Sequence, residues 1–280
     1  MQDPKFTPTK YQDIVDQLFV TCYLGTKNSS NDTLDRAARV AQGIGSKHFA
    51  VNIDDTYDQI IKIMESATGK VPKFSSQGGS MSEDLALQNI QARTRMVVSF
   101  FMAQLVPWAN GNQGFLLVLG AANIAEGLFG YLTKYDCSAA DLNPIGGINK
   151  TDLRAFLKWF AKDANLDVFR EIAEAKPSAE LRPFDPKTNS YSTQDDEEEM
   201  GLTYAELDEF GRLRKIERCG PLSMFERLVI KWDHLTPSQV SEKVKRFFTA
   251  YSKSRHKMTV LTPSYHAESY GVDDNRFDLR

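Results

Sequence analysis

The first part of the chain alternates between amphipathic and apolar stretches. Apolar residues recur at helical spacing in TKYQDIVDQLF, and FVTCYLG (19–25) follows as a short apolar run ending in glycine. We therefore predict a helix and then a buried strand. NSSNDTLDRAARVAQGIG predicts a capped helix with a glycine stop, HFAVNI (48–53) a second strand, and DTYDQIIKIMESATG another helix. Strands that alternate with helices indicate an α/β fold with a parallel sheet.

The middle of the chain continues this pattern around one long helix. Residues 70–84 are rich in Gly, Ser and Pro and predict a loop, after which an apolar pattern at helical spacing predicts a long helix over 83–107. FLLVLG (115–120) is fully apolar and ends in glycine. We expect it to be a central parallel strand, buried on both faces. Further helices are expected to begin in ANIAEGLFGYL and near DLRAFLKWFAKD.

The last part is more polar and mostly helical. Clear helical patterns occupy 203–218 and 236–251, and the polar stretch 174–201 predicts a mobile loop. We therefore divide the chain into an α/β nucleotide-binding core, residues 1–165, and a helical C-terminal part of the same domain, residues 166–280. A doubly wound nucleotide-binding fold binds phosphate just after its first strand. No Gly-rich phosphate loop follows any predicted strand, so we expect the chain to lack that first strand.

Composition and charge exclude several classes of protein. With 280 residues, 41% hydrophobic and 25% charged, the chain has the composition of an ordinary globular protein. A net charge of -3 disfavours nucleic acid and anionic membranes as partners. Cys22, Cys137 and Cys219 are odd in number and lack CxxC spacing, which favours free thiols. No apolar run approaches the roughly 18 residues that span a bilayer. We expect a cytoplasmic protein.

The stretch LFGYLTKYDCSAADLNPIGGINKTDLRAFL (128–157) stands out because it sets many charged residues and turn formers between two helical patterns. GGINKT does not fit the phosphate loop G-x-x-x-x-G-K-S/T, because proline and asparagine occupy glycine positions. Taken by themselves, its charges would be solvated side chains at a helix boundary. The motifs around it give another interpretation.

Several motifs follow one another in an order that resembles the synthetase domain of glutamine-dependent NAD synthetase. These are LQNIQARTRM (87–96), VLGAANIAEGLFGYLTKYDCSAADLNPIGGINKTDLR (118–154), PSAEL (177–181), DDEEEMGLTYAEL (195–207) and SRHKMTVLTPSYHAESY (254–270). The resemblance extends from about residue 20 to the end. It implies an adenine-nucleotide α-hydrolase-like fold, that is, a Rossmann-like parallel sheet flanked by helices.

The resemblance also implies a reaction in two steps. In that family the nicotinate carboxylate of deamido-NAD attacks the α-phosphorus of ATP and releases pyrophosphate. Ammonia from a glutaminase domain then displaces AMP from the acyl adenylate, giving NAD. Such a site must neutralise phosphate charge and hold Mg²⁺ by oxygen ligands.

Residue by residue, the resemblance implies the following roles. Glu126 corresponds to the Mg²⁺-binding glutamate, and Lys150 to the catalytic lysine that contacts both the nicotinate end and ATP. Deamido-NAD would be bound by Arg93, Lys134, Asp141, His256 and Lys257, and ATP by Thr26, Lys150 and Ser178. Asp196 and Glu197, with Ser178, fall in the loop that closes over the adenylate and are carried over as catalytic. Without the resemblance, Arg93 packs its methylenes on a helix face, the acids belong to a solvated loop, and His256 and Lys257 form a basic helix end.

The chain departs from the family pattern in three ways. Ala121 and Ala125 stand where relatives more often have a hydroxyl residue and an acid. The S-G-G-x-D-S loop and the glutaminase domain are not found, so we expect a C-terminal piece of a larger enzyme. Two alternatives stay open: a non-catalytic module that binds deamido-NAD or assembles with intact subunits, and an unrelated helical scaffold. The family forms homo-oligomers, and the helix at 83–107 is our candidate interface, with plain core burial as the alternative.

Overall fold

The computed structural model describes residues 6–176, 180–185, 190–191, 196–265 and 270–271. The chain divides into two compact units. The first comprises Met1–Thr94 and Arg154–Gln194, and the second Arg95–Leu153 and Asp195–Arg280. Helices α4 (Met81–Ala109) and α6 (Lys150–Asp163) contribute residues to both units. The division expected near residue 165 stays a prediction.

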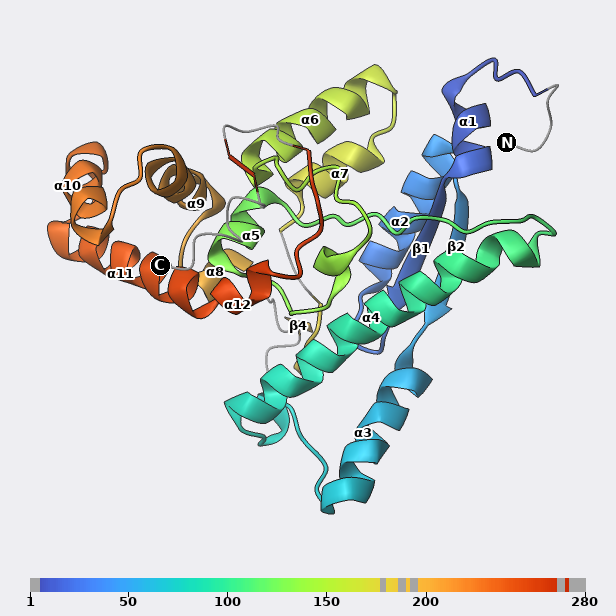
Figure 1. The fold of residues 1–280 in the computed structure, drawn as a ribbon, viewed down its shortest axis with the longest axis horizontal. Coiled ribbons are helices and arrows are strands. Elements are labelled where there is room, and N and C mark those ends of the chain that lie inside the picture. The colour runs from blue at the N-terminus through green and yellow to red at the C-terminus, as the bar shows by residue number, and fades with distance from the viewer. Residues whose placement is uncertain (1–5, 177–179, 186–189, 192–195, 266–269, 272–280) are drawn as a thin grey trace. The chain divides into compact units, whose positions relative to one another are not determined.

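The first unit is built on two parallel strands (Figure 1). In chain order it holds α1 (Tyr11–Leu18), β1 (Val20–Gly25), α2 (Asn31–Ile44), β2 (Lys47–Asn52), α3 (Asp54–Thr68) and a 3-10 turn at Ser75–Gln77. The strands pair in register from Val20 opposite Lys47 to Gly25 opposite Asn52. Helix α2 connects them and packs on both, as the crossover helix between two parallel strands does.

Side-chain contacts close the first unit around this crossover. Helix α7 (Val168–Glu174) packs on α2, and the Arg39 guanidinium donates to both carboxylate oxygens of Glu171, at 2.9 and 2.5 Å. Strands β3 (Phe184–Asp185) and β4 (Ser190–Tyr191) form a short antiparallel pair. A small core gathers buried residues of α3, α4 and the intervening loop: Tyr57, Leu87 and Phe74.

The second unit is helical among its described residues. It holds α5 (Ile124–Phe129), a 3-10 turn at Cys137–Ala139, α8 (Asp196–Met200), α9 (Tyr204–Gly211), a π-helical turn at Arg212–Ile216, α10 (Pro221–Lys231), α11 (Pro237–Lys253) and α12 (Arg255–Met258). Its core packs α5, α9, α10 and α11 together. At the centre Phe210 stacks on Phe247 with ring centroids 4.7 Å apart, and Trp232 meets Phe210 edge-on.

The element pattern confirms most of the sequence prediction. The parallel α/β character, the N-terminal helix, both early strands and the long helix lie within a few residues of the expected bounds. The three cysteines are free. No helix among the described residues is long and apolar enough to cross a membrane.

The prediction of a central strand at FLLVLG (115–120) is wrong. Only Leu119 pairs, in an isolated parallel bridge with Leu142, and Phe115 and Leu117 are 70% and 60% exposed. The carboxylate of Asp141 accepts the Val118 N–H at 2.8 Å, which takes a donor that a strand ladder would use. Helix α10 was not predicted, and α8 lies inside the stretch expected to be loop.

Candidate functional site

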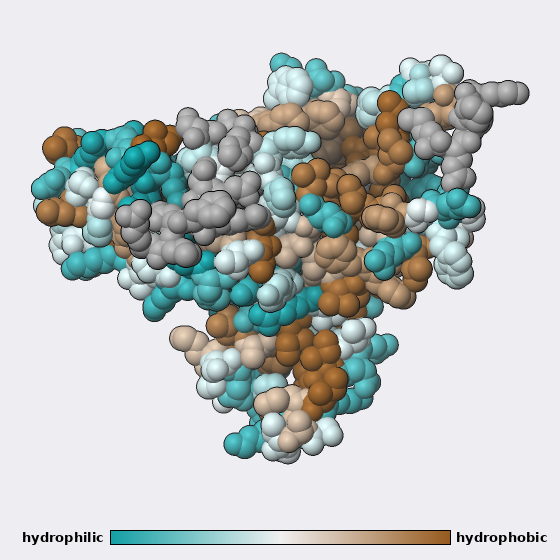
Figure 2. Space-filling model, viewed as in Figure 1, coloured by the Kyte–Doolittle hydropathy of each residue, from teal (hydrophilic) through white to brown (hydrophobic). Residues whose placement is uncertain are grey.

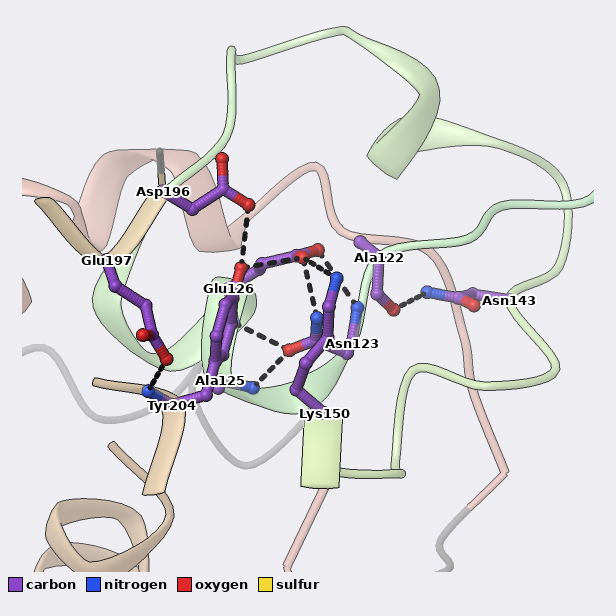
Figure 3. Close-up of polar contacts among 9 residues, drawn as sticks. All are labelled: Ala122, Asn123, Ala125, Glu126, Asn143, Lys150, Asp196, Glu197 and Tyr204. Carbon is purple, nitrogen blue, oxygen red and sulfur yellow. Dashed lines mark hydrogen bonds and ion pairs between the residues drawn. The ribbon is translucent and has the colours of Figure 1, made fainter. Parts of the chain in front are cut away.

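The site forms around the first turn of α5. The side-chain oxygen of Asn123 accepts the N–H groups of Ala125 and Glu126, and the Glu126 carboxylate accepts the Asn123 N–H at 3.1 Å and its side-chain amide at 2.6 Å. This capping box satisfies donors at the helix start and fixes the Glu126 carboxylate there (Figure 3). The Asn143 amide donates to the Ala122 carbonyl at 2.7 Å and holds the residue before the cap.

Lys150 approaches the same carboxylate from the first turn of α6. Its Nζ lies 3.4 Å from Glu126 Oε1 and 5.1 Å from the centroid of the Tyr204 ring (Figure 3). The Lys150 side chain is 26% exposed and that of Glu126 18% exposed. The pair is therefore partly buried, which strengthens its attraction, yet it stays accessible to a ligand from solvent.

Asp196 completes the cluster from the start of α8. Asp196 and Tyr204 are both buried, at 7% and 2% exposure. The Tyr204 hydroxyl lies 3.0 Å from Asp196 Oδ2 and 3.3 Å from Glu126 Oε1. Three predicted site residues from two motifs, Glu126 and Lys150 from 118–154 and Asp196 from 195–207, thus meet at Tyr204, a residue to which no role was assigned from the sequence.

Burial dominates the electrostatics of this cluster. It raises the pKa of the Glu126 carboxyl, against the opposing effect of the Lys150 ammonium. It also raises the pKa of Asp196, although the hydrogen bond from Tyr204 acts the other way. The Tyr204 phenol has a raised pKa because of burial and the two neighbouring carboxylates, so it remains a protonated donor at neutral pH. Groups with such shifts gather at functional sites.

The cluster fits one mode of magnesium binding. No group of three or more His, Cys, Asp or Glu side chains is arranged as a metal cage among the described residues. Mg²⁺ is, however, commonly held by one or two carboxylates together with water and substrate phosphates. Glu126 and Asp196 supply such a pair, and Asp196 Oδ1 is buried without a hydrogen-bond partner in the described part of the chain.

Two further acids of α8 anchor that helix to its surroundings. Glu197 Oε1 accepts the Tyr204 backbone N–H at 2.9 Å. Glu199 accepts the Tyr131 hydroxyl at 2.7 Å. Glu197 was predicted to be catalytic, and its carboxylate lies at the start of α9, next to the residue that carries the shared hydroxyl.

The predicted ligands on the following loop and on α12 have distinct environments. Lys134 is partly exposed, with its ammonium 5.3 Å from the Tyr135 ring centroid, and Asp141 is exposed. His256 is exposed, and its Nδ1 lies 2.9 Å from the Lys253 carbonyl oxygen. Lys257 instead donates to the carbonyls of Gly130 and Leu132, at 2.8 Å each, and burial lowers its pKa.

The other predicted site residues do not belong to this cluster. Arg93 on α4 and the buried Thr26 after β1 are part of the first unit, whereas Glu126, Lys150 and Asp196 are part of the second. The Thr26 hydroxyl accepts the Asn28 N–H at 3.2 Å within its own loop. Ser178 lies outside the described residues.

Sequence reasoning missed Asn123 and Tyr204. A signal was available for Asn123, because N-x-x-E before an apolar run is a capping box. No comparable signal marks Tyr204, whose ring packs among residues distant in the sequence. Its contact with Glu126 joins positions 78 apart.

Comparisons with known proteins agree with these observations. The family model described as NAD synthase matches residues 11–261. Glutamine-dependent NAD(+) synthetase of Rattus norvegicus is 53% identical over 100% of this chain and 38% of its own length, and that of Saccharomyces cerevisiae is 53% identical over 98% and 38%. The chain therefore spans about two fifths of the length of these curated relatives.

A solved structure matches the fold as well. The glutamine-dependent NAD(+) synthetase of Cytophaga hutchinsonii superposes with a TM-score of 0.72, covering 96% of this chain and 40% of that one, at 24% identity. At this identity the likeness supports the fold alone, and the family rests on the sequence match across residues 11–261. This chain belongs to the NAD synthase family.

Proposed function

We propose that the chain carries the amide-forming ligase step of NAD synthesis, the ATP-dependent amidation of deamido-NAD to NAD. Family membership supports this proposal. The observation that carries it is the cluster of Lys150, Glu126 and Asp196, in which a partly exposed cation faces two carboxylates with raised pKa values. This arrangement provides the charges that phosphoryl transfer needs within one site.

The chemistry proceeds by adenylation and then amidation. A carboxylate oxygen of deamido-NAD forms a bond to the α-phosphorus of ATP while the bond to pyrophosphate breaks. The nitrogen of ammonia then bonds to the carbonyl carbon, the carbon–oxygen bond to AMP breaks, and nitrogen releases a proton. Adenylation is needed because a free carboxylate is a poor acylating agent.

Lys150 is suited to the first step. Its ammonium is a compact charge on a flexible stem, which can follow a phosphate that changes geometry. In this structure it pairs with Glu126 while remaining 26% exposed. An arriving phosphate can therefore replace Glu126 as its partner without unfolding the site.

Glu126 and Asp196 are the residues that would hold Mg²⁺. When bound, the ion would neutralise phosphate charge and polarise the phosphoryl group. The capping box and the Tyr204 hydroxyl keep both carboxylates facing the same volume beside Lys150.

The other roles remain part of the proposal. Arg93, Lys134, Asp141, His256 and Lys257 would serve deamido-NAD, and Thr26 and Ser178 would serve ATP. Glu197 would act indirectly, by anchoring α8 to the backbone of Tyr204. Ammonia would come from a glutaminase domain, in line with the longer curated relatives. The cytoplasmic location inferred from the sequence is also kept as a proposal.

NAD formation by the purified chain tests the proposal. ATP, Mg²⁺, deamido-NAD and high ammonium would be supplied, since ammonium replaces a glutaminase. We expect NAD to form, and Lys150→Ala to slow it about 100-fold or more, as expected for removing a group that stabilises transition-state charge. The matched control is Lys158→Ala on the same helix, whose side chain is 54% exposed and pairs only loosely with Glu174, at 3.9 Å.

The outcomes separate the rival functions. Equal rates for both lysine variants would show that Lys150 has no special role in the reaction. A folded chain that binds deamido-NAD but forms no NAD would instead be a non-catalytic binding module.

A further inference from the structure

The Tyr204 side chain contacts all three members of the cluster. Its ring lies 5.1 Å from Lys150 Nζ, and its hydroxyl lies 3.0 Å from Asp196 and 3.3 Å from Glu126 (Figure 3). It lies within the motif DDEEEMGLTYAEL (195–207), but no role was assigned to it from the sequence. Its position raises the question of whether it merely fills the core or also orders the site.

The two ends of the side chain act on different groups. An ammonium within about 6 Å of an aromatic centroid is attracted to the ring face, so the ring restrains Lys150. The hydroxyl has a single hydrogen to donate, and two carboxylates compete for it. Both carboxylates lie within hydrogen-bond distance of this one atom, so the hydroxyl can donate to either of them.

Tyr204 itself is held rigidly. It is 2% exposed, its backbone N–H donates to Glu197, and it follows the Thr203 N-cap, whose hydroxyl accepts the Glu206 N–H. Helix α9 packs on α5 in the core of the second unit. A side chain anchored in this way can transmit a fixed geometry to groups that are themselves partly exposed.

We propose that Tyr204 is a positioning residue for the ligase reaction, holding Lys150, Glu126 and Asp196 in one arrangement. The proposal rests on the proposed function. If Tyr204 had only a structural role, removing its hydroxyl would affect the stability of the protein as much as in another core tyrosine. It would leave turnover unchanged. The distinction therefore lies in turnover at matched stability.

Two tyrosine variants and a matched control test this. Tyr204→Phe removes only the hydroxyl, and Tyr204→Leu removes the ring as well. The control is Tyr251→Phe, which deletes the hydroxyl of another tyrosine in the same core, 1% exposed and hydrogen-bonded by Lys215 at 2.9 Å. Melting curves, kcat, and KM for ATP and deamido-NAD would be measured for each.

We expect Tyr204→Phe to lower kcat about 10- to 100-fold, the range seen when a group that orients a ligating side chain is lost. The KM for ATP should rise, in line with weaker binding of the nucleotide, while the KM for deamido-NAD should change little, and the two Phe variants should melt at similar temperatures. Tyr204→Leu should lose more activity because Lys150 also loses the ring. A kcat for Tyr204→Phe within about twofold of Tyr251→Phe would overturn the positioning role, given that the range above starts at tenfold.

A binding measurement keeps the two proposals apart. The probe is the α,β-methylene analogue of ATP with Mg²⁺, titrated calorimetrically. If the wild-type chain forms no NAD, the proposed function fails, and Tyr204 is then judged by affinity for this probe. About tenfold weaker binding by Tyr204→Phe supports positioning. Equal binding, or no binding by the wild type, overturns it.

Discussion

Two lysines predicted for the same site have opposite environments. The Lys150 ammonium faces Glu126 and is partly exposed, so it can exchange partners. The Lys257 ammonium is committed to two backbone carbonyls just after α5, and burial lowers its pKa. Lys257 therefore fixes the loop that leads to Lys134, whatever ligand the site takes.

The environment of Lys257 predicts a pH dependence of stability. Its folded pKa lies below the usual 10.5 that the unfolded chain retains, so between these values the unfolded chain binds more protons. Wild-type stability should therefore rise with pH across this window, relative to Lys257→Met. The variant should be less stable by about 1–3 kcal/mol because two hydrogen bonds to a charged donor are lost.

Urea unfolding at several pH values up to about 10 checks this, since the window ends near the ordinary lysine pKa. The gap between wild type and Lys257→Met should widen as pH rises. Lys253→Met, at an exposed position near the end of α11, should show no such trend. A gap that narrows with pH would contradict the assigned environment.

At the residue scale, the sequence identified most of the candidate site residues but not which of them contact one another. Glu126, Lys150 and Asp196 came from the family resemblance, and the structure brings them together. Tyr204 lies in the motif 195–207 but was given no role, because the end of its side chain contacts Glu126 and Lys150, which are far from it in the sequence.

At the scale of elements, helices whose sequences carry N-cap and C-cap residues were predicted well. Helix α2 begins after Ser30, whose hydroxyl accepts the Thr33 N–H, and ends at Gly45 with φ of 79°. The apolar run 115–120 also ends in glycine, but an apolar run alone does not show whether partner strands exist. Helix α10 was missed because its Gly220-Pro221 start also fits a turn.

The cap of α5 links helix formation to the site, which gives a prediction. Asn123→Ala removes the acceptor for two N–H groups and the amide bonded to Glu126. It should lower the free energy of unfolding by about 1 kcal/mol, as for other N-cap losses. It should also lower kcat for NAD formation by about tenfold, because Glu126 loses an orienting partner.

Thr236→Ala is the matched control, since Thr236 caps α11 with an equivalent box through Gln239. Both variants should lose similar stability, measured by thermal melting, but only Asn123→Ala should lose turnover. Equal turnover in the two variants would show that the cap serves the helix alone.

At the scale of the whole molecule, the order of the motifs was the most informative feature of the sequence. Short patterns such as GGINKT are ambiguous by themselves, whereas the succession from 87–96 to 254–270 predicted the family, and the match over residues 11–261 confirms it. Association with other chains is a different matter. It depends on which apolar residues are exposed on the surface. The periodicity of apolar residues does not show whether a helix face is buried in the core or lies at an interface.

The long helix α4 offers a candidate surface for association between copies of the chain. Val97, Phe101, Leu105 and Trp108 recur at spacings that place them on one face of α4, and they are 67%, 62%, 38% and 71% exposed. Apolar side chains are also visible along the middle of α4 in Figure 2. An apolar helix face of this kind is typical of an interface, and the proposed homo-oligomer would bury it against a second copy.

A charge on this face should therefore prevent association. We expect the wild-type chain to sediment as a dimer or larger species and Phe101→Glu as a monomer, because an unpaired carboxylate would be buried at the interface. Ile230→Glu on α10 is the control, as it places the same charge at an apolar position that is 80% exposed. Sedimentation velocity would compare the three proteins at one concentration. A monomeric wild type, or association unchanged in Phe101→Glu, would rule out this face as the contact between copies.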